Sequence, residues 1–237
     1  MQKTCLLLLF TFFLFSLSAI THSHYDENEI RFVKDKKPLN DQYQSLLRSS
    51  GLWQQFQENN PNWFVIFNEQ NQLPHRAFGS PIQINSVNDF LINNNFILPN
   101  DLRESYSIKN DKYITKKFIQ YHNNLEVIGS SLYAKLTNDN KIVSFGLDLF
   151  NEINLDVNPI IDINEAINSA TSNILNPITN IIVEDELKIL AVPVYRDYKH
   201  HLIYQATFST TTDHGPANYL CYVDAHTGQL LMRKNMV

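Results

Sequence analysis

The stretch FIQYHNNLEVIGSSLYAK, residues 118–135, is followed by KIVSFGLDLF at 141–150, and these two segments decide the fold. The pair Asn123-Asn124 separates two runs that are rich in β-branched and aromatic residues. This is the pattern of a hairpin, because Asn enters the left-handed backbone region at little cost. A second turn falls at 137–140. The stretch therefore predicts three antiparallel strands.

Apolar side chains fall on alternate positions in the last two of these strands, as they do where one face of a sheet is buried. The opposite face is then expected to be exposed to solvent and to carry the binding surface of the protein. The side chains expected to point inward are Ile128, Leu132, Ala134, Leu136, Val143, Phe145, Leu147 and Leu149.

Helices and a further hairpin are expected before this sheet. Residues 42–59 have helical spacing of apolar side chains, and Gly51 is expected to divide them into two short helices. Residues 63–78 have the pattern of a hairpin with aromatic anchors. Residues 87–96 fit a short helix, and a loop is expected at 99–104.

The spacing of apolar residues changes from a strand pattern to a helix pattern after Asn158-Pro159. Asp162 and Glu165 have the spacing of a capping box, which predicts a helix whose apolar stripe ends at Pro177. Four strands are predicted after this helix, with a turn at 196–200 between the first two. Their expected ranges are 187–195, 202–211, 219–224 and 229–233.

We therefore predict an α+β fold of two lobes, each an antiparallel β-sheet packed with helices. The first lobe is expected at 42–150 and the second at 159–237. A polar N-terminal arm, 20–41, is expected to precede them.

The first 19 residues have the pattern of a secretory signal peptide. Lys3 precedes an apolar run that is too short to span a bilayer, and small residues make cleavage near Ala19 the expected outcome. The mature chain is then exported to the extracellular space or the periplasm, without a stable membrane anchor. Only Cys221 remains after cleavage, so no intrachain disulfide is expected.

Composition narrows the class of partner. The chain has 237 residues, 43% of them hydrophobic, which is enough for a core. Its net charge is −5 and it has no extended Lys/Arg cluster, so the electrostatic footprint of a nucleic-acid-binding protein is missing.

The sequence lacks the common catalytic motifs. It contains no HExxH zinc motif, G-x-S-x-G elbow or Cys-x-x-Cys pair. Because the chain has only 6 glycines, a Gly-rich phosphate-binding loop is not expected. His22 and His24 would bind copper only if cleavage left one of them at the third position. The acidic run 184–186 is interpreted as a solvated strand entry rather than a metal site.

Four other residues have a structural and a functional interpretation. His200 and His201 fall in a predicted turn, where solvated side chains are the first interpretation and a ligand role is the alternative. Cys221 is interpreted as core packing, with a thiolate that silences a partner's zinc as the alternative. Asp224 is expected to order its turn by hydrogen bonds to the backbone rather than to act as an acid.

Three segments together resemble the prosegments of secreted thermolysin- and fungalysin-like zinc metallopeptidases. Residues 63–79 are similar to the hairpin that precedes the main motif, and 222–231 with the helix around Glu165 resemble a PepSY domain. Residues 118–130 resemble the FTP domain, although Asn124 stands where the family usually has Gly. The residues that match its Q-x-Y, "EV" and Gly pattern are Gln120, Tyr121, Leu125, Glu126, Val127 and Gly129.

This resemblance, which spans 42 to the end, implies a propeptide-type inhibitor and intramolecular folding chaperone of a zymogen. The zinc ligands and the catalytic Glu of the peptidase are absent from the sequence, so no enzyme activity and no cofactor are expected here, and zinc is expected in the partner. The implied partner-binding residues are Gln120, Tyr121, Glu126, Val127 and Gly129. The expected processing segment is Met232, Arg233, Lys234, Asn235, Met236 and Val237.

Two alternatives stay open at this point. The chain is either a fragment of a peptidase precursor or a free-standing secreted module that regulates peptidases, or another extracellular partner, in trans. An enzyme of unknown type is the third interpretation.

Overall fold

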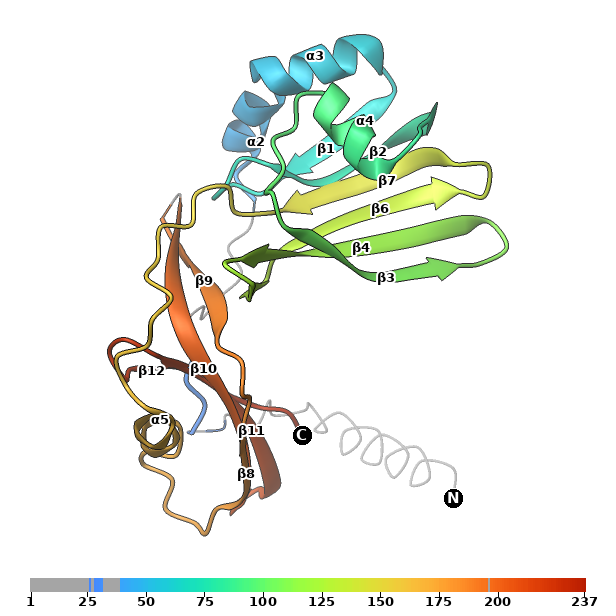
Figure 1. The fold of residues 1–237 in the computed structure, drawn as a ribbon. Coiled ribbons are helices and arrows are strands. Elements are labelled where there is room, and N and C mark those ends of the chain that lie inside the picture. Colours follow the sequence, from blue (N-terminus) through green and yellow to red (C-terminus); the bar gives the residue numbers. More distant parts are fainter. Residues whose placement is uncertain (1–25, 27, 32–38, 196) are drawn as a thin grey trace, which may run out of the picture.

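The computed structural model describes residues 26, 28–31, 39–195 and 197–237. They form an α+β fold in which one mixed sheet of twelve strands carries four described helices (Figure 1). The predicted signal peptide and most of the predicted arm lie outside this part of the chain. The helices are α2 (Asp41–Arg48), α3 (Gly51–Asn59), α4 (Val87–Asn93) and α5 (Ile163–Ala170).

The main path of the sheet runs β1-β2-β7-β6-β4-β5-β9-β10-β11-β12, with β3 beside β4 and β8 beside β10. Every pair is antiparallel except β5 with β9, which makes the sheet mixed. The strands are β1 (Trp63–Phe67), β2 (Pro74–Gln83), β3 (Leu102–Lys109), β4 (Tyr113–His122), β5 (Leu125–Ile128), β6 (Ser131–Thr137), β7 (Lys141–Asp148), β8 (Thr179–Val183), β9 (Lys188–Val194), β10 (Asp197–Thr212), β11 (Gly215–Asp224) and β12 (Leu230–Asn235).

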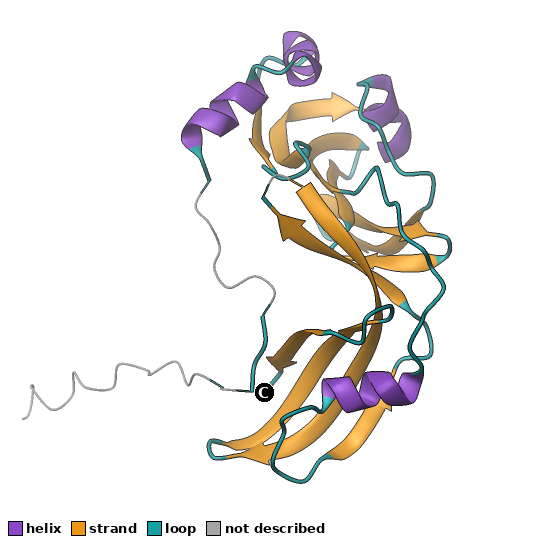
Figure 2. Cartoon of the chain, turned by 90° about the vertical axis from the view of Figure 1, so that its left-hand side faces the viewer, coloured by secondary structure: helices purple, strands orange, loops and turns teal. Residues whose placement is uncertain are grey.

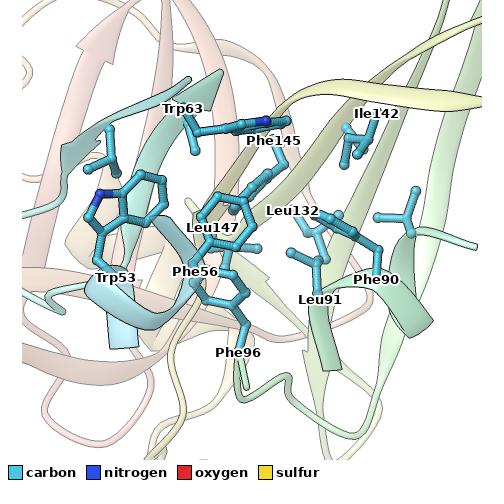
Figure 3. Close-up of a cluster of buried hydrophobic side chains, with 14 of the residues drawn as sticks. Trp53, Phe56, Trp63, Phe90, Leu91, Phe96, Leu132, Ile142, Phe145 and Leu147 are labelled. Atoms are coloured by element: carbon cyan, nitrogen blue, oxygen red, sulfur yellow. The ribbon is translucent and has the colours of Figure 1, made fainter. Parts of the chain in front are cut away.

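An aromatic cluster fills the core of the N-terminal half, where α2, α3 and α4 cover the sheet (Figures 1 and 3). The ring of Phe56 lies 4.9 Å from Trp53, 5.5 Å from Trp63 and 6.0 Å from Phe145, measured between centroids. Tilted and edge-on pairs of this kind contribute about 0.5–1.5 kcal/mol each beyond the area they bury. This cluster fixes how the helices sit on β1, β2, β6 and β7.

A separate cluster lies under α5 in the C-terminal half. Ala166 and Ala170 pack against Phe208, Cys221 and Val223 on β10 and β11, and their small side chains let the helix approach the sheet closely. Figure 2 shows α5 on one side of these strands. The other face of β10–β12 has no described helix on it.

Several local predictions are confirmed. Gly51 begins α3, so residues 42–59 form two helices as expected. Asp162 and Glu165 make both hydrogen bonds of a capping box at the start of α5. Asn123 and Asn124 adopt φ values of 50° and 66°, which is the left-handed turn that the hairpin requires.

The second predicted strand of the organising stretch is divided in the structure. At Gly129 and Ser130 the chain passes from β5 to β6, and both of these strands pair with β4. On their other sides β5 pairs with β9, whereas β6 pairs with β7. The sheet therefore forks at Gly129, and the two sheets expected for two lobes are one continuous mixed sheet.

Register explains one incorrect side-chain prediction. The β6–β7 pairing shifts between Lys135 and Leu136, so that Leu136 lies opposite Ile142 while Lys135 lies opposite Ser144. Val143, which was expected to point inward, is the extra residue of this β-bulge and is only partly buried. Ile142 is fully buried instead.

Three element predictions also differ from the structure, and one strand was not predicted. The loop expected at 99–104 contains the start of β3, and β8 was not predicted. The turn expected at 196–200 is mostly strand, because β10 begins at Asp197. The helix expected to reach Pro177 ends at Ala170, where Thr171 is the C-cap.

Candidate functional site

The fork of the sheet is held by one buried side chain. Gln120 donates from Nε2 to the Phe150 carbonyl oxygen at 2.6 Å and accepts at Oε1 from the Phe150 N–H at 2.9 Å. Its own N–H donates to Ser130 Oγ at 3.0 Å. Gly129 has a φ of 85°, where a side chain would be strained. These contacts fix the point at which β5 and β6 separate.

A cleft of about 1000 Å³ lies at this fork. One wall comes from the β1–β2 turn and the end of β7, and the other from β9, β10 and the uncovered face of β11 and β12. Residues of the fork lie between the walls. The lining residues used below are Asn68, Glu69, His75, Ile128, Gly129, Asp148, Leu190, Ala191, Pro193, Tyr198, Leu220, Tyr222, Met232, Lys234 and Met236.

Tyr121 and Glu126, two of the residues implied to bind a partner, are neighbours on the β4–β5 ladder and are partly exposed. Arg103 Cζ lies 3.9 Å from the centroid of the Tyr121 ring, which is a cation–π contact. Glu126 Oε2 lies 3.8 Å from Lys188 Nζ. They form one accessible patch, and Tyr121 borders a second, smaller cavity rather than the cleft.

The other three implied residues have different positions. Gln120 and Val127 are buried, so in this conformation their side chains support the hairpin and do not reach a partner. Gly129 lines the cleft. The role of the whole set in binding stays a prediction.

The predicted processing segment is mostly strand. Met232 to Asn235 belong to β12, and Ile30 forms a bridge with Arg233 on the outer edge of that strand. Arg233 is 2% exposed, whereas Met236 and Val237 are exposed. Cleavage in this segment stays a prediction, and within β12 it would require the strand to leave the sheet.

A buried hydrogen bond that the sequence did not predict joins His201 of β10 to Asp224 at the end of β11. His201 is in β10 rather than in a solvated turn, and its Nδ1 lies 2.5 Å from Asp224 Oδ2 in a buried contact. Asp224 Oδ1 accepts hydrogen bonds from the N–H groups of His226 at 2.9 Å and Thr227 at 2.7 Å. The prediction that Asp224 orders its turn is confirmed. His200 is half-buried, and burial lowers its pKa.

The Asp224 pair makes stability depend on acid pH. Burial raises the pKa of Asp224, but the hydrogen bonds from His201, Thr227 and His226 outweigh it, so the native pKa lies below the ordinary value of 3.8. Its contribution is therefore complete above that value and is lost as the pH falls toward the native pKa. We expect Asp224→Asn to cost ~1–2 kcal/mol at neutral pH and to lose less stability than the wild type as the pH falls below 3.8, the ordinary pKa of the carboxyl group. Urea unfolding measures both, and parallel pH curves would contradict it.

The remaining candidates have structural roles. Cys221 is fully buried, and burial raises its pKa to about 11, which confirms the packing interpretation. Glu184 pairs with Lys188 at 2.7 Å, and Asp185 and Glu186 are exposed. Within the described ranges no three His, Cys, Asp or Glu side chains gather as metal ligands would. His22 and His24 precede the first described residue.

Among the helices that the structure describes, none is long and apolar enough to cross a bilayer. No protein-family model matches the sequence, and no curated protein matches it either. The structure is similar to that of the C-terminal domain of YpeB from Bacillus megaterium, with a TM-score of 0.36 and 16% identity. That similarity covers 86% of this chain and 100% of the other.

Proposed function

We propose that this chain is a secreted, non-catalytic propeptide-type inhibitor and folding chaperone of a thermolysin-like zinc metallopeptidase. It acts within a precursor or as a separate chain, and the zinc belongs to the partner. The division into an FTP-like part, 42–150, and a PepSY-like part, 159–237, belongs to the same proposal.

The observation that supports it best is the cleft. Ile128 and Gly129 come directly after the Glu126-Val127 pair of the motif, and they line the same cleft as Met232 of the processing segment. Two segments that the resemblance singled out, about a hundred residues apart in the sequence, therefore border one concave surface. Concave, mostly apolar surfaces with a few polar groups are the usual binding sites of proteins.

The mechanism needs only backbone recognition and mass action. The segment that follows β12 is the part we propose to lie extended across the active-site cleft of the peptidase, bound by main-chain hydrogen bonds as a substrate strand would be. As a chaperone, the chain stabilises its partner because it binds the native-like state and not the unfolded state. Tyr121 and Glu126 contribute the accessible side chains of the motif.

We expect the double variant Tyr121→Ala/Glu126→Ala to raise the inhibition constant at least tenfold, because each truncation removes roughly 1 kcal/mol of binding. Thermolysin is the probe. The measurements are casein hydrolysis at increasing concentrations of the chain and the yield of refolded, active thermolysin. Tyr106→Ala is the matched control, since Tyr106 is exposed on β3 opposite Lys117 and outside the Tyr121–Glu126 patch.

The outcomes separate the two functions. Unchanged inhibition by a variant that remains folded removes the Tyr121–Glu126 patch from the binding surface. A wild-type chain that neither inhibits nor refolds thermolysin contradicts the proposal for this peptidase type and favours a free-standing module for another extracellular partner.

A further inference from the structure

One face of the sheet in the N-terminal half has no described helix on it. The helices α2, α3 and α4 cover the opposite face, where Ala77, Ala134 and Phe145 are fully buried (Figure 1). Side chains alternate along a strand, so the residues next to these three point to the uncovered face. Residues directly opposite each other on paired strands share a face. The strand register therefore identifies the side chains of the uncovered face.

Two neighbouring rows of side chains cross this face, which we call the open face. The first row crosses six strands from β1 to β3 and consists of Phe64, Phe78, Ser144, Lys135, Thr115 and Ile108. The second crosses β7, β6, β4 and β3 and consists of Gly146, Tyr133, Lys117 and Tyr106. Arg76 lies two positions before Phe78 on β2 and therefore points to the same side.

The open face is basic. Its charged side chains are Arg76, Lys117 and Lys135, and in the described part of the chain none of them forms an ion pair with a carboxylate. Asp148, the carboxylate on the same side of β7, lies 2.9 Å from His75 Nδ1. Positive charge is thus concentrated on this face, although the net charge of the chain is −5.

Large apolar and aromatic side chains flank these cations. Phe64 and Phe78 stack with their centroids 5.8 Å apart and are 63% and 44% exposed. At the other end of the first row Ile108 is 60% exposed. The ring of Tyr133 lies over Gly146, where a Cβ would be 2.1 Å from its Cε1. Cations beside exposed apolar side chains are the combination found on proteins that lie at a membrane interface.

The arrangement favours a lipid surface over other anionic partners. None of these cations and rings lines the cleft at the fork or the cavity beside Tyr121, so the face is not the concave site that a small ligand needs. Lysine is depleted in the cores of protein interfaces, whereas its ammonium group binds phosphate as a point charge. Arg76 on β2 and Lys117 on β4 are three strand spacings apart, about 14 Å, which suits a surface of many separate phosphates.

We propose that the open face binds the surface of an anionic lipid bilayer reversibly. Arg76, Lys117 and Lys135 lie at the lipid phosphates, and Phe64 and Phe78 enter the interfacial layer. Each Lys or Arg near such a surface strengthens binding roughly fivefold. The net charge of the chain does not prevent this, because carboxylates more than about 8 Å from the surface are screened at physiological salt. The binding requires no peptidase, so it fails or succeeds independently of the proposed function.

The experiment uses residues 20–237, because the apolar run of the predicted signal peptide would itself enter a bilayer. Sedimentation gives the partition coefficients with vesicles of phosphatidylcholine alone and of phosphatidylcholine mixed with phosphatidylglycerol. We expect at least roughly tenfold stronger binding to the anionic vesicles, and loss of this preference when the salt concentration rises from about 0.1 M to about 1 M.

Lys117→Gln/Lys135→Gln is expected to weaken binding to the anionic vesicles at least roughly tenfold, because two of the three cations are lost. The matched control is Lys199→Gln/Lys234→Gln, which removes the same charge from exposed positions of β10 and β12. We expect this control to bind within about twofold of the wild type, since both positions lie outside the open face.

A fluorescence measurement reports whether apolar side chains enter the bilayer. Trp53 and Trp63 are each 1% exposed, so in Phe64→Trp the added indole is the one that a vesicle can reach. We expect its emission to shift to shorter wavelength with the anionic vesicles. Equal binding to both kinds of vesicle, no shift in emission, or equal losses in the two lysine variants overturns the proposal. Binding to poly-L-glutamate that anionic vesicles do not displace also overturns it, and assigns the face to an acidic polypeptide.

Discussion

Replacing Gly146 with alanine is expected to lower the free energy of unfolding by at least ~3 kcal/mol, because the added methyl group has no space. An ideal Cβ on Gly146 would lie 2.1 Å from Tyr133 Cε1 and 2.4 Å from the carbonyl oxygen of His75. Tyr133 is directly opposite Gly146 on β6. The ring can move, but the carbonyl belongs to the β2 backbone, so relief requires a shift of the central strands.

Urea unfolding followed by circular dichroism measures this loss. Gly51→Ala is the matched control, since a Cβ there meets no atom within 4 Å, and we expect its stability to lie within about 1 kcal/mol of the wild type. The double variant Tyr133→Ala/Gly146→Ala should be more stable than the sum of the two single changes predicts, because the ring no longer meets the methyl group. A Gly146→Ala protein as stable as the wild type would mean that β2 and β7 adapt without cost.

The sequence predicted the features that neighbouring residues determine. The Asn123-Asn124 turn and the capping box at Asp162 each depend on a few adjacent side chains, and both are present. The break at Gly51 was found in the same way. These features depend only on residues within one turn of backbone, so they form independently of the pairings made by the rest of the chain.

The features that were missed depend on partners far away in the sequence. The parallel pairing of Val127 with Ile189 joins segments 62 positions apart, and no local pattern marks it. The His201–Asp224 contact requires the correct start of β10, which the predicted turn displaced. The fork at Gly129, and with it the cleft, follows from these distant pairings.

Arg233, in the candidate site, is also held by partners far away in the sequence. Its replacement is the second change for which we expect a large loss of stability. The sequence placed Arg233 at the end of the last predicted strand, in the expected processing segment, and gave no sign that its guanidinium is buried and bonded to backbone carbonyls. Nη2 donates to Ala170 at 2.9 Å and to Ser172 at 2.7 Å, while Nη1 donates to Asn28 at 3.2 Å. Ala170 is the last residue of α5, so the cation also lies at the negative end of the helix.

We expect Arg233→Met to lower the free energy of unfolding by ~3 kcal/mol, since Met fills the space of the side chain but removes the guanidinium donors from these carbonyls. Arg233→Lys should recover only part of the loss, because an ammonium cannot reproduce the planar fork of donors. Lys234→Ala, on the exposed next residue, is the control and should stay within about 0.5 kcal/mol of the wild type.

A second measurement distinguishes local detachment of α5 from unfolding of the whole chain. The thiol of Cys221 is buried beneath the end of α5, and its Sγ lies 3.8 Å from the same Ala170 oxygen that Arg233 binds. If Arg233 fastens α5 to the sheet, Arg233→Met should expose Cys221 to a thiol reagent at urea concentrations below the unfolding transition. Equal thiol protection and equal stability in the variant would mean that packing of Ala166 and Ala170 alone holds the helix.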